Sequence, residues 1–192
     1  MAIISHTHKF CFIHTPKTAG SSISFVLNKY AKQVHIPNSS RSAKGWQIPL
    51  HEYGMHNAVS NFIDKVPDGY FKFAFVRNPF DLLASGFVDR HYVNFENFIK
   101  TSLSKDKRLF HKWTQWEYLS VNDTIAVDFV GRYEHLATDW HYVCERIGIK
   151  DFNLPVKNAS DKHHYTEYYN DETREIVATR YAKDLEYWGY EF

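Results

Sequence analysis

The chain has 192 residues, of which 44% are hydrophobic and 23% charged, a balance typical of a folded globular domain. Lysine and arginine number 23 against 22 aspartate and glutamate residues, and this near-neutral balance argues against a general nucleic-acid-binding protein. No apolar run is long enough to span a membrane and the first residues do not resemble a signal peptide, so we expect a cytoplasmic chain. Cys11 and Cys144 lie far apart in apolar segments, which favours free thiols over a disulfide.

The first third of the chain predicts a strand, a turn and a helix. Residues 9–14 are rich in β-forming side chains, and apolar residues recur at helical spacing over about residues 21–32. Residues 34–50 are polar and contain proline and glycine, which predicts a long loop. A short helix is expected over residues 57–64.

The clearest strand is residues 71–76, which are mostly apolar on both faces, as in a buried parallel strand. Asn78 is a suitable N-cap and Pro79 suits the first helical position, so a helix is predicted from there through about Arg90.

The second half of the chain continues the alternation. Helical structure is expected over residues 95–119, a third strand over 126–131 and a helix over 136–147. An irregular polar segment at 154–169 precedes a last helix that starts at residues 170–171. Strands that alternate with helices predict an α/β fold, with a central parallel sheet flanked by helices.

The first candidate site follows the predicted strand at residues 9–14 and reads Thr15-Pro16-Lys17-Thr18-Ala19-Gly20-Ser21-Ser22. A strand that turns into a helix places unpaired backbone N–H groups at the helix N-terminus, where they can bind an anion. Ala19 and Gly20 allow close approach of the backbone, and Lys17 adds a full positive charge. The chain contains no Gly-Lys-Ser/Thr triplet, so the segment is P-loop-like without being a Walker A motif. A capped helix start with a solvated lysine is the simpler alternative.

The second candidate site consists of Arg77, which ends the strand at 71–76, and Ser85, two turns into the next helix. Ligands of open α/β folds bind at the carboxyl edge of the sheet, where both residues are expected. A guanidinium with a hydroxyl nearby suits a phosphate monoester. Taken alone, these two residues would also fit a surface arginine and a neutral helix residue.

Together these segments resemble the sulfotransferases that use 3′-phosphoadenosine 5′-phosphosulfate (PAPS). Residues 12–22 (Phe12-Ile13-His14-Thr15-Pro16-Lys17-Thr18-Ala19-Gly20-Ser21-Ser22) are similar to the 5′-phosphosulfate loop of that family. Residues 73–81 (Phe73-Ala74-Phe75-Val76-Arg77-Asn78-Pro79-Phe80-Asp81), with Ser85, are similar to its 3′-phosphate-binding strand and helix. Residues 129–134 and 181–192 also resemble the carbohydrate-type branch.

The resemblance implies a single P-loop-like sulfotransferase domain over residues 1–192, which transfers a sulfuryl group from PAPS to an acceptor hydroxyl without a metal. It implies that Lys17 contacts the bridging oxygen and the transferring group, and that Arg77 and Ser85 hold the 3′-phosphate. The residues expected to bind the donor are Pro16, Lys17, Thr18, Ala19, Gly20, Ser21, Ser22, Arg77 and Ser85. Many relatives carry a basic residue where this chain has Leu82, so one auxiliary contact is in doubt.

Sulfuryl transfer needs a base for the acceptor hydroxyl, and histidine has a suitable pKa. His56 heads the short predicted helix at a position resembling the base histidine of the family, while His51 and Glu52 are rivals.

Two histidine pairs could suggest a metal site, His6 with His8 and His163 with His164. Neither pair has the cysteine or carboxylate neighbours that a zinc site normally shows, so solvated histidines are expected and no metal. The resemblance implies that the polar loop around the second pair closes over the nucleotide, as the corresponding loop does in relatives, and its candidate contacts are Lys157, Lys162 and Tyr165.

Two other functions remain open. A P-loop-type ATP-dependent phosphotransferase would need magnesium and a carboxylate at a strand end, for which Asp128 is the candidate. A nucleotide-binding module without catalysis would bind the donor and release no product. The acceptor also stays open: a sugar could stack on Trp46 or Tyr53, but both would serve equally well in packing.

Overall fold

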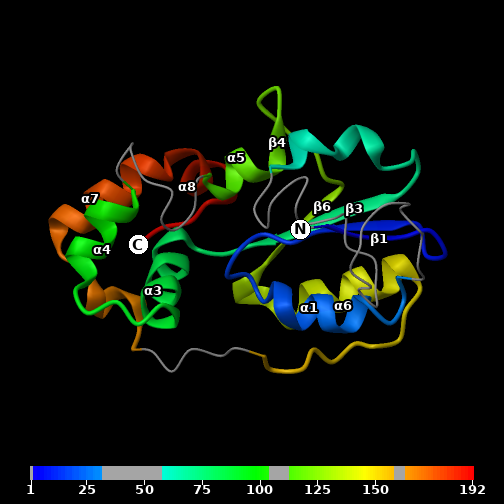
Figure 1. Ribbon diagram of the computed structural model, residues 1–192, viewed down its shortest axis with the longest axis horizontal. Helices are drawn as coiled ribbons and strands as arrows, with labels where there is room; N and C mark the ends of the chain where they lie inside the picture. Colours follow the sequence, from blue (N-terminus) through cyan, green and yellow to red (C-terminus); the bar gives the residue numbers. More distant parts are fainter. Residues whose placement is uncertain (1, 32–57, 104–112, 158–162) are drawn as a thin grey trace, which may run out of the picture.

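A computed structural model describes residues 2–31, 58–103, 113–157 and 163–192, and its central feature is a four-stranded sheet (Figure 1). The strands are β1 (Ala2–Ser5), β2 (Phe10–Ile13), β3 (Phe71–Val76) and β6 (Phe129–Arg132), in the order β1-β2-β3-β6. β2, β3 and β6 run parallel, whereas β1 pairs antiparallel with β2. The α/β class with a central, mostly parallel sheet is therefore confirmed, and the antiparallel edge strand β1 is an addition to it.

The helices are α1 (Gly20–Leu27), α3 (Pro79–Asp89), α4 (Phe95–Ser102), α5 (Gln115–Leu119), α6 (Leu136–Ile147), α7 (Asp171–Arg180) and α8 (Ala182–Trp188). Short 3₁₀ turns cover Val59–Asn61, Ile63–Lys65, Tyr133–His135 and Tyr165–Tyr168. A small hairpin is formed by β4 (Ser120–Val121) and β5 (Thr124–Ile125).

The two faces of the sheet are covered by different elements because successive strand residues point to opposite faces. On one face, Phe12 and Phe73 pack against α1 and α6. Trp140 of α6 is the largest fully buried side chain of this cluster. Figure 1 shows these two helices side by side on that face. On the other face, Ile13 and Val76 pack against the turn at Val59–Asn61, α5 and the end of α8. A third apolar cluster joins α3, α4 and α7.

Several predicted helix boundaries were wrong. The first helix stops at Leu27 instead of continuing to about residue 32, and the helix expected over 57–64 is a pair of 3₁₀ turns. The last helix is broken at Tyr181, a fully buried residue that ends α7 and precedes α8. The long loop predicted at 34–50 lies outside the described residues.

The parallel pairing of β2 with β3 positions the site. Ile13 lies beside Ala74 in the register, so the loop after β2 and the residues after β3 leave the sheet at the same edge. The two candidate anion sites, separated by about sixty residues of sequence, are thereby brought to adjacent strand ends.

Candidate functional site

The loop between β2 and α1 crosses the carboxyl edge of the sheet beside the end of β3. Lys17 and Ala19 both have a φ of 60°, in the left-handed region that side chains other than glycine rarely adopt. The Thr15 hydroxyl donates to the carbonyl of Phe75 in β3, and the Thr18 hydroxyl donates to the Thr15 carbonyl at 2.9 Å. These bonds tie the loop to β3 and hold its strained conformation.

Gly20, the first residue of α1, lies directly against the imidazole of His14. A Cβ atom added at Gly20 would meet the His14 Nε2 atom at 2.0 Å, which no side chain could tolerate without movement. Gly20 therefore fits against His14 where any larger residue would force that ring to move, and it also leaves the backbone at the helix N-terminus exposed. His14 also stacks on Phe12 at a ring-centroid distance of 5.9 Å, and it faces the pocket described next.

Both predicted anion sites open into one pocket of about 230 Å³. Its lining residues are His14, Lys17, Ala19, Gly20, Ser21, Ser22, Arg77, Ser85, Tyr133, Leu136, Leu154, Pro155, Val156 and Lys157. One wall is thus the N-terminus of α1, with its backbone N–H groups and serine hydroxyls. Apolar lining comes from Leu136 at the start of α6 and from Leu154, Pro155 and Val156, and Lys157 follows them.

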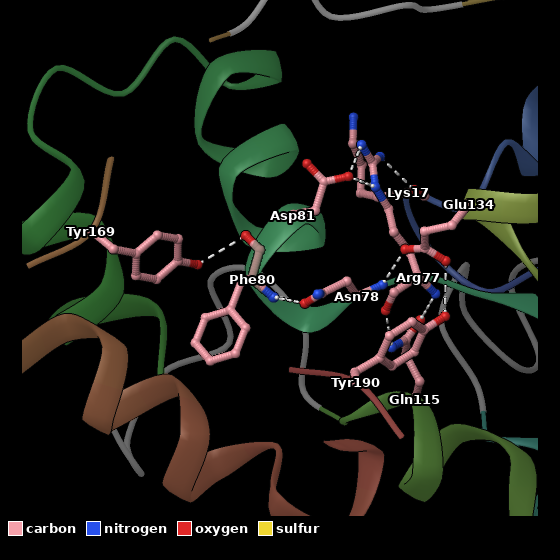
Figure 2. A network of polar contacts seen from close by, with 9 residues as sticks. All are labelled: Lys17, Arg77, Asn78, Phe80, Asp81, Gln115, Glu134, Tyr169 and Tyr190. Carbon is pink, nitrogen blue, oxygen red and sulfur yellow. Dashed lines mark hydrogen bonds and ion pairs between the residues drawn. The ribbon is translucent and has the colours of Figure 1, made fainter. Parts of the chain in front are cut away.

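Arg77 is buried and held from three sides (Figure 2). Its Nε and Nη2 atoms each lie 2.7 Å from Oδ2 of Asp81, and Nη1 donates to the Lys17 carbonyl at 3.0 Å. The guanidinium carbon lies 3.9 Å from the centre of the Tyr133 ring, within cation–π range. These contacts hold the side chain in one position in the pocket.

Lys17 is the second cation of the pocket, and its Nζ atom lies 3.2 Å from Oδ2 of Asp89 at the end of α3. Asp81, Ser85 and Asp89 follow one another at intervals of four residues, so they share one face of that helix. The two aspartates of this face pair with Arg77 and Lys17 respectively, and buried Ser85 lies between them in sequence.

The turn after β3 is fastened to remote parts of the chain (Figure 2). The backbone N–H of Asn78 donates to Oε1 of Glu134 at 2.7 Å, and the hydroxyl of Tyr190 donates to the other oxygen of that carboxylate at 3.0 Å. The Asn78 amide donates to the Glu191 carbonyl at 2.7 Å and also caps α3 by accepting from the N–H of Phe80. Asn78 thus serves as the predicted N-cap, and its other bonds anchor the chain directly after Arg77.

The structure brings seven of the expected donor-binding residues to this pocket, namely Lys17, Ala19, Gly20, Ser21, Ser22, Arg77 and Ser85. The other two have different surroundings. The Thr18 side chain is fully buried and bonded within the loop, and Pro16 lines a separate small cavity that also contains Leu82. Three residues considered for the base, His56, His51 and Glu52, lie outside the described residues, as do Lys162, Trp46 and Tyr53.

Of the other residues singled out from the sequence, Asp128 and Tyr165 lie away from the pocket, and Lys157 lines it. Asp128 immediately precedes β6 and pairs with Lys72 at 3.3 Å, at the amino end of the strands. Tyr165 packs against Phe192 with ring centroids 5.7 Å apart, whereas Lys157 does line the pocket, with its Nζ atom 3.9 Å from the centre of the Phe25 ring.

The predicted free thiols are present as such, and burial raises the pKa of both Cys11 and Cys144 to about 12. His6 contacts the Tyr70 hydroxyl, and His8 contacts the Ile147 carbonyl. Within the described ranges, no cluster of three histidine, cysteine, aspartate or glutamate side chains is arranged to hold a metal. Nor does this part of the chain contain a helix with the length and hydrophobicity needed to cross a membrane.

Sequence reasoning missed His14, Tyr133, Leu136 and Asp89. The helical spacing of Asp89 from Ser85 was a usable signal, because residues four apart share a face. His14 had no such signal, since a residue at the end of a strand can point to either side of the sheet.

A strand–loop–helix turn with backbone N–H groups at the helix start, beside a buried arginine at the adjacent strand end, is an arrangement suited to a phosphorylated ligand. The comparisons with known proteins are more specific. A family model described as the sulfotransferase family matches residues 1–191, and the chain belongs to that family. This membership supports sulfuryl transfer as the general activity.

A curated relative, an uncharacterized protein from Archaeoglobus fulgidus, is 29% identical over 107 residues. The matched region covers 52% of this chain and 87% of that protein. No solved structure matches the chain.

Proposed function

We propose that the chain is a PAPS-dependent sulfotransferase that transfers the sulfuryl group to the hydroxyl of an acceptor, either a carbohydrate or a small molecule. The observation that supports this most is that Lys17 and Arg77, from adjacent parallel strands, line the same pocket. A ligand with phosphate groups at two separate positions of one adenosine would use both cations. The segments resembling the carbohydrate-type branch favour a glycan acceptor.

In this proposal the donor is held at three places. The backbone N–H groups at the start of α1 and the hydroxyls of Ser21 and Ser22 bind the 5′-phosphate. Arg77 and Ser85 bind the 3′-phosphate, and the apolar wall formed by Leu136 and Leu154 flanks the nucleoside.

The chemical step is an in-line displacement at sulfur. The acceptor oxygen forms a bond to sulfur while the bond from sulfur to the 5′-phosphate oxygen breaks, and the acceptor proton passes to a base, for which we propose His56. Lys17 stabilises the negative charge that develops on the leaving phosphate oxygen, because a preorganised charge outside bulk water is effective there.

Binding of the desulfated product, 3′-phosphoadenosine 5′-phosphate (PAP), tests the proposal directly. Isothermal titration calorimetry is expected to show binding of PAP, and PAPS is expected to compete for the same site. A screen of hydroxylated acceptors with PAPS, read by mass spectrometry, should then show a mass increase of one sulfuryl group. A chain that bound neither PAP nor PAPS would contradict the proposal.

A phosphotransferase activity is disfavoured by the position of Asp128. Its carboxylate pairs with Lys72 and accepts from the Lys72 N–H at 2.7 Å, at the edge of the sheet opposite the pocket. It is therefore badly placed to hold a magnesium ion beside Lys17. A non-catalytic binding module would differ from our proposal by binding PAPS without forming a sulfated product.

A further inference from the structure

The backbone of Arg77 is held by a side chain from another element, the amide of Gln115 at the start of α5 (Figure 2). The Oε1 atom of Gln115 accepts from the Arg77 N–H at 2.8 Å, and its Nε2 atom donates to the Arg77 carbonyl at 2.8 Å. Arg77 directly follows β3, where the register with β6 ends at Val76. A single side-chain amide therefore supplies, one residue beyond the strand, the pair of bonds that a neighbouring strand would make.

The orientation of this amide is set by Asp184 of α8. Oδ1 of Asp184 accepts from the Gln115 backbone N–H at 2.9 Å and from its Nε2 atom at 3.2 Å, while Oδ2 accepts from the Trp116 N–H at 3.2 Å. Because the carboxylate faces Nε2, the carbonyl oxygen of the amide is directed to the Arg77 N–H. Asp184 is fully buried, and Gln115 and Arg77 are about 95% buried.

The guanidinium of the same arginine is anchored independently. Asp81 accepts two of its bonds and the Lys17 carbonyl a third, so three of the five N–H groups of an arginine are engaged by these residues. The remaining donors can face a phosphate only if the Cα atom of Arg77 lies at the right place and the chain leaves β3 in the right direction. The bonds to Gln115 act on the Arg77 backbone itself, whereas the bonds of Asn78 to Glu134 and Glu191 hold the next residue.

We propose that Gln115 and Asp184 are positioning residues for the donor, which hold the Arg77 backbone so that its guanidinium meets the 3′-phosphate. The inference rests on the proposed function and deepens it by naming residues, far from Arg77 in sequence, that determine recognition of one phosphate group. Neither residue lines the pocket, so both act through Arg77.

The alternative to the positioning role is a purely structural one, in which these bonds fasten α5 and α8 to the sheet and do not affect how Arg77 meets the ligand. The two roles differ in which ligand they affect. PAP carries the 3′-phosphate, whereas adenosine 5′-phosphate (AMP) lacks it and shares everything else. Loss of positioning should weaken PAP selectively, while loss of structural integrity should weaken both nucleotides.

The main experiment measures the dissociation constants of PAP and AMP for the wild type and for Gln115→Met, with weak AMP binding read by competition. Wild type is expected to prefer PAP by about ten- to a hundredfold, the range for charge-assisted bonds to one phosphate. Gln115→Met keeps the length of the side chain and removes both bonds to Arg77. We expect it to reduce this preference by at least about threefold, while AMP affinity stays within about twofold.

Three further variants sharpen the result. Asp184→Asn should reduce the preference for PAP over AMP as well. Its amide has only one acceptor oxygen, so an NH₂ group would face the N–H groups of either Gln115 or Trp116. Gln115→Asn, which is too short to reach Arg77, is the milder variant should Gln115→Met fold poorly. Thr173→Val is the matched control: it removes a buried partner of the α7 capping box, lowers stability, and should leave the preference unchanged.

The outcomes separate the two proposals. If the wild type did not distinguish PAP from AMP, the proposed function would fail. If the wild type distinguished them and the folded Gln115 variants kept the same ratio, or lost affinity for both equally, the positioning role would be overturned while the function stood. In an Arg77→Ala background, Gln115→Met should produce no further change in the ratio.

Discussion

Lys17 is the residue on which the proposed chemistry depends most, and it forms an ion pair with Asp89. Its ammonium lies 3.2 Å from Asp89, with side-chain exposures of 19% and 48%. A partly exposed pair of this kind contributes about 0–1 kcal/mol, so a multiply charged donor can displace the aspartate.

Replacing Lys17 by alanine should lower turnover about a hundred- to a thousandfold, the range for losing one preorganised donor to a developing charge. Lys29→Ala is a suitable control, because Lys29 also forms an exposed ion pair, with Asp151 at 3.1 Å. The turnover number with saturating PAPS is the measurement. A Lys17→Ala enzyme with turnover within a few-fold of wild type would remove Lys17 from the chemical step.

The base is a prediction that comes from the sequence alone. His56→Ala should lose about a hundred- to ten-thousandfold in turnover if His56 accepts the acceptor proton. PAP affinity should change little, since the base acts on the acceptor. His51→Ala and Glu52→Gln, measured in the same assay, would identify either rival, and near-normal turnover of His56→Ala would exclude His56.

Gly20 shows how one atom can matter at this site. Gly20→Ala would place a Cβ atom 2.0 Å from the His14 ring and force that ring to move. Overpacking of this kind costs about 1–3 kcal/mol, measurable as a lower free energy of unfolding in urea. The double variant with His14→Ala should recover part of the loss. Ser21→Ala, at the next and exposed position, should be nearly neutral, and equal effects at both positions would refute the steric explanation.

At the scale of elements, α5 and α8 meet the sheet through one buried carboxylate. Burial raises the pKa of Asp184 from 3.8 to about 6, although several N–H groups donate to it, so desolvation outweighs the hydrogen bonds. Because the pKa is raised in the folded state, the neutral form favours folding. The contribution of this group is fully present below pH 4 and is lost as pH rises through about 6.

The raised pKa of Asp184 predicts a measurable dependence of the free energy of unfolding on pH. The contribution of Asp184 to the free energy of unfolding should fall by up to about 3 kcal/mol between pH 4 and pH 7, at 1.36 kcal/mol per pKa unit. Urea unfolding of wild type and Asp184→Asn at both pH values isolates the group, because the other carboxylates titrate in both proteins. A difference between the two proteins that stayed constant with pH would contradict the raised pKa.

The capping of α5 and α7 explains why these short helices begin where they do. Thr114 accepts from the N–H of Glu117 and Glu117 accepts from the N–H of Thr114, and Asn170 with Thr173 repeats the arrangement in α7. The first of these boxes starts α5 at Gln115, the residue that holds Arg77.

At the scale of the whole molecule, the pocket gathers segments from four parts of the chain: residues 14–22, 77–85, 133–136 and 154–157. The first three segments follow the parallel strands β2, β3 and β6 at one edge of the sheet, and residues 154–157 complete the lining. Asp128 lies at the opposite edge.

The separation of Asp128 from the pocket predicts how the protein responds to metal removal. Sulfuryl transfer should proceed undiminished in EDTA, because in the proposed mechanism Lys17 and the α1 N-terminus counter the charge on the leaving phosphate. Addition of magnesium should not restore or raise turnover. A reaction that stopped in EDTA and resumed with magnesium would favour the phosphotransferase alternative.

The sequence by itself determined the α/β class through local patterns, and together with the family resemblance it indicated seven residues that line the pocket. Apolar periodicity marks β3 and α6, Asn78 and Pro79 mark the start of α3, and a short turn between strand and helix marks the anion cradle. Parallel strands then bring their ends together by geometry alone. The antiparallel pairing of β1 carried no comparable local signal.

Only the tertiary structure decided what surrounds Arg77 and Gly20. Gln115 lies 38 residues from Arg77 and Asp184 lies 69 residues from Gln115, and no periodicity or motif connects them. Their meeting depends on how α5 and α8 pack against the sheet, where buried polar groups must find partners because burying them unpaired costs free energy. That demand is met by residues remote in sequence, and it set the surroundings of Arg77.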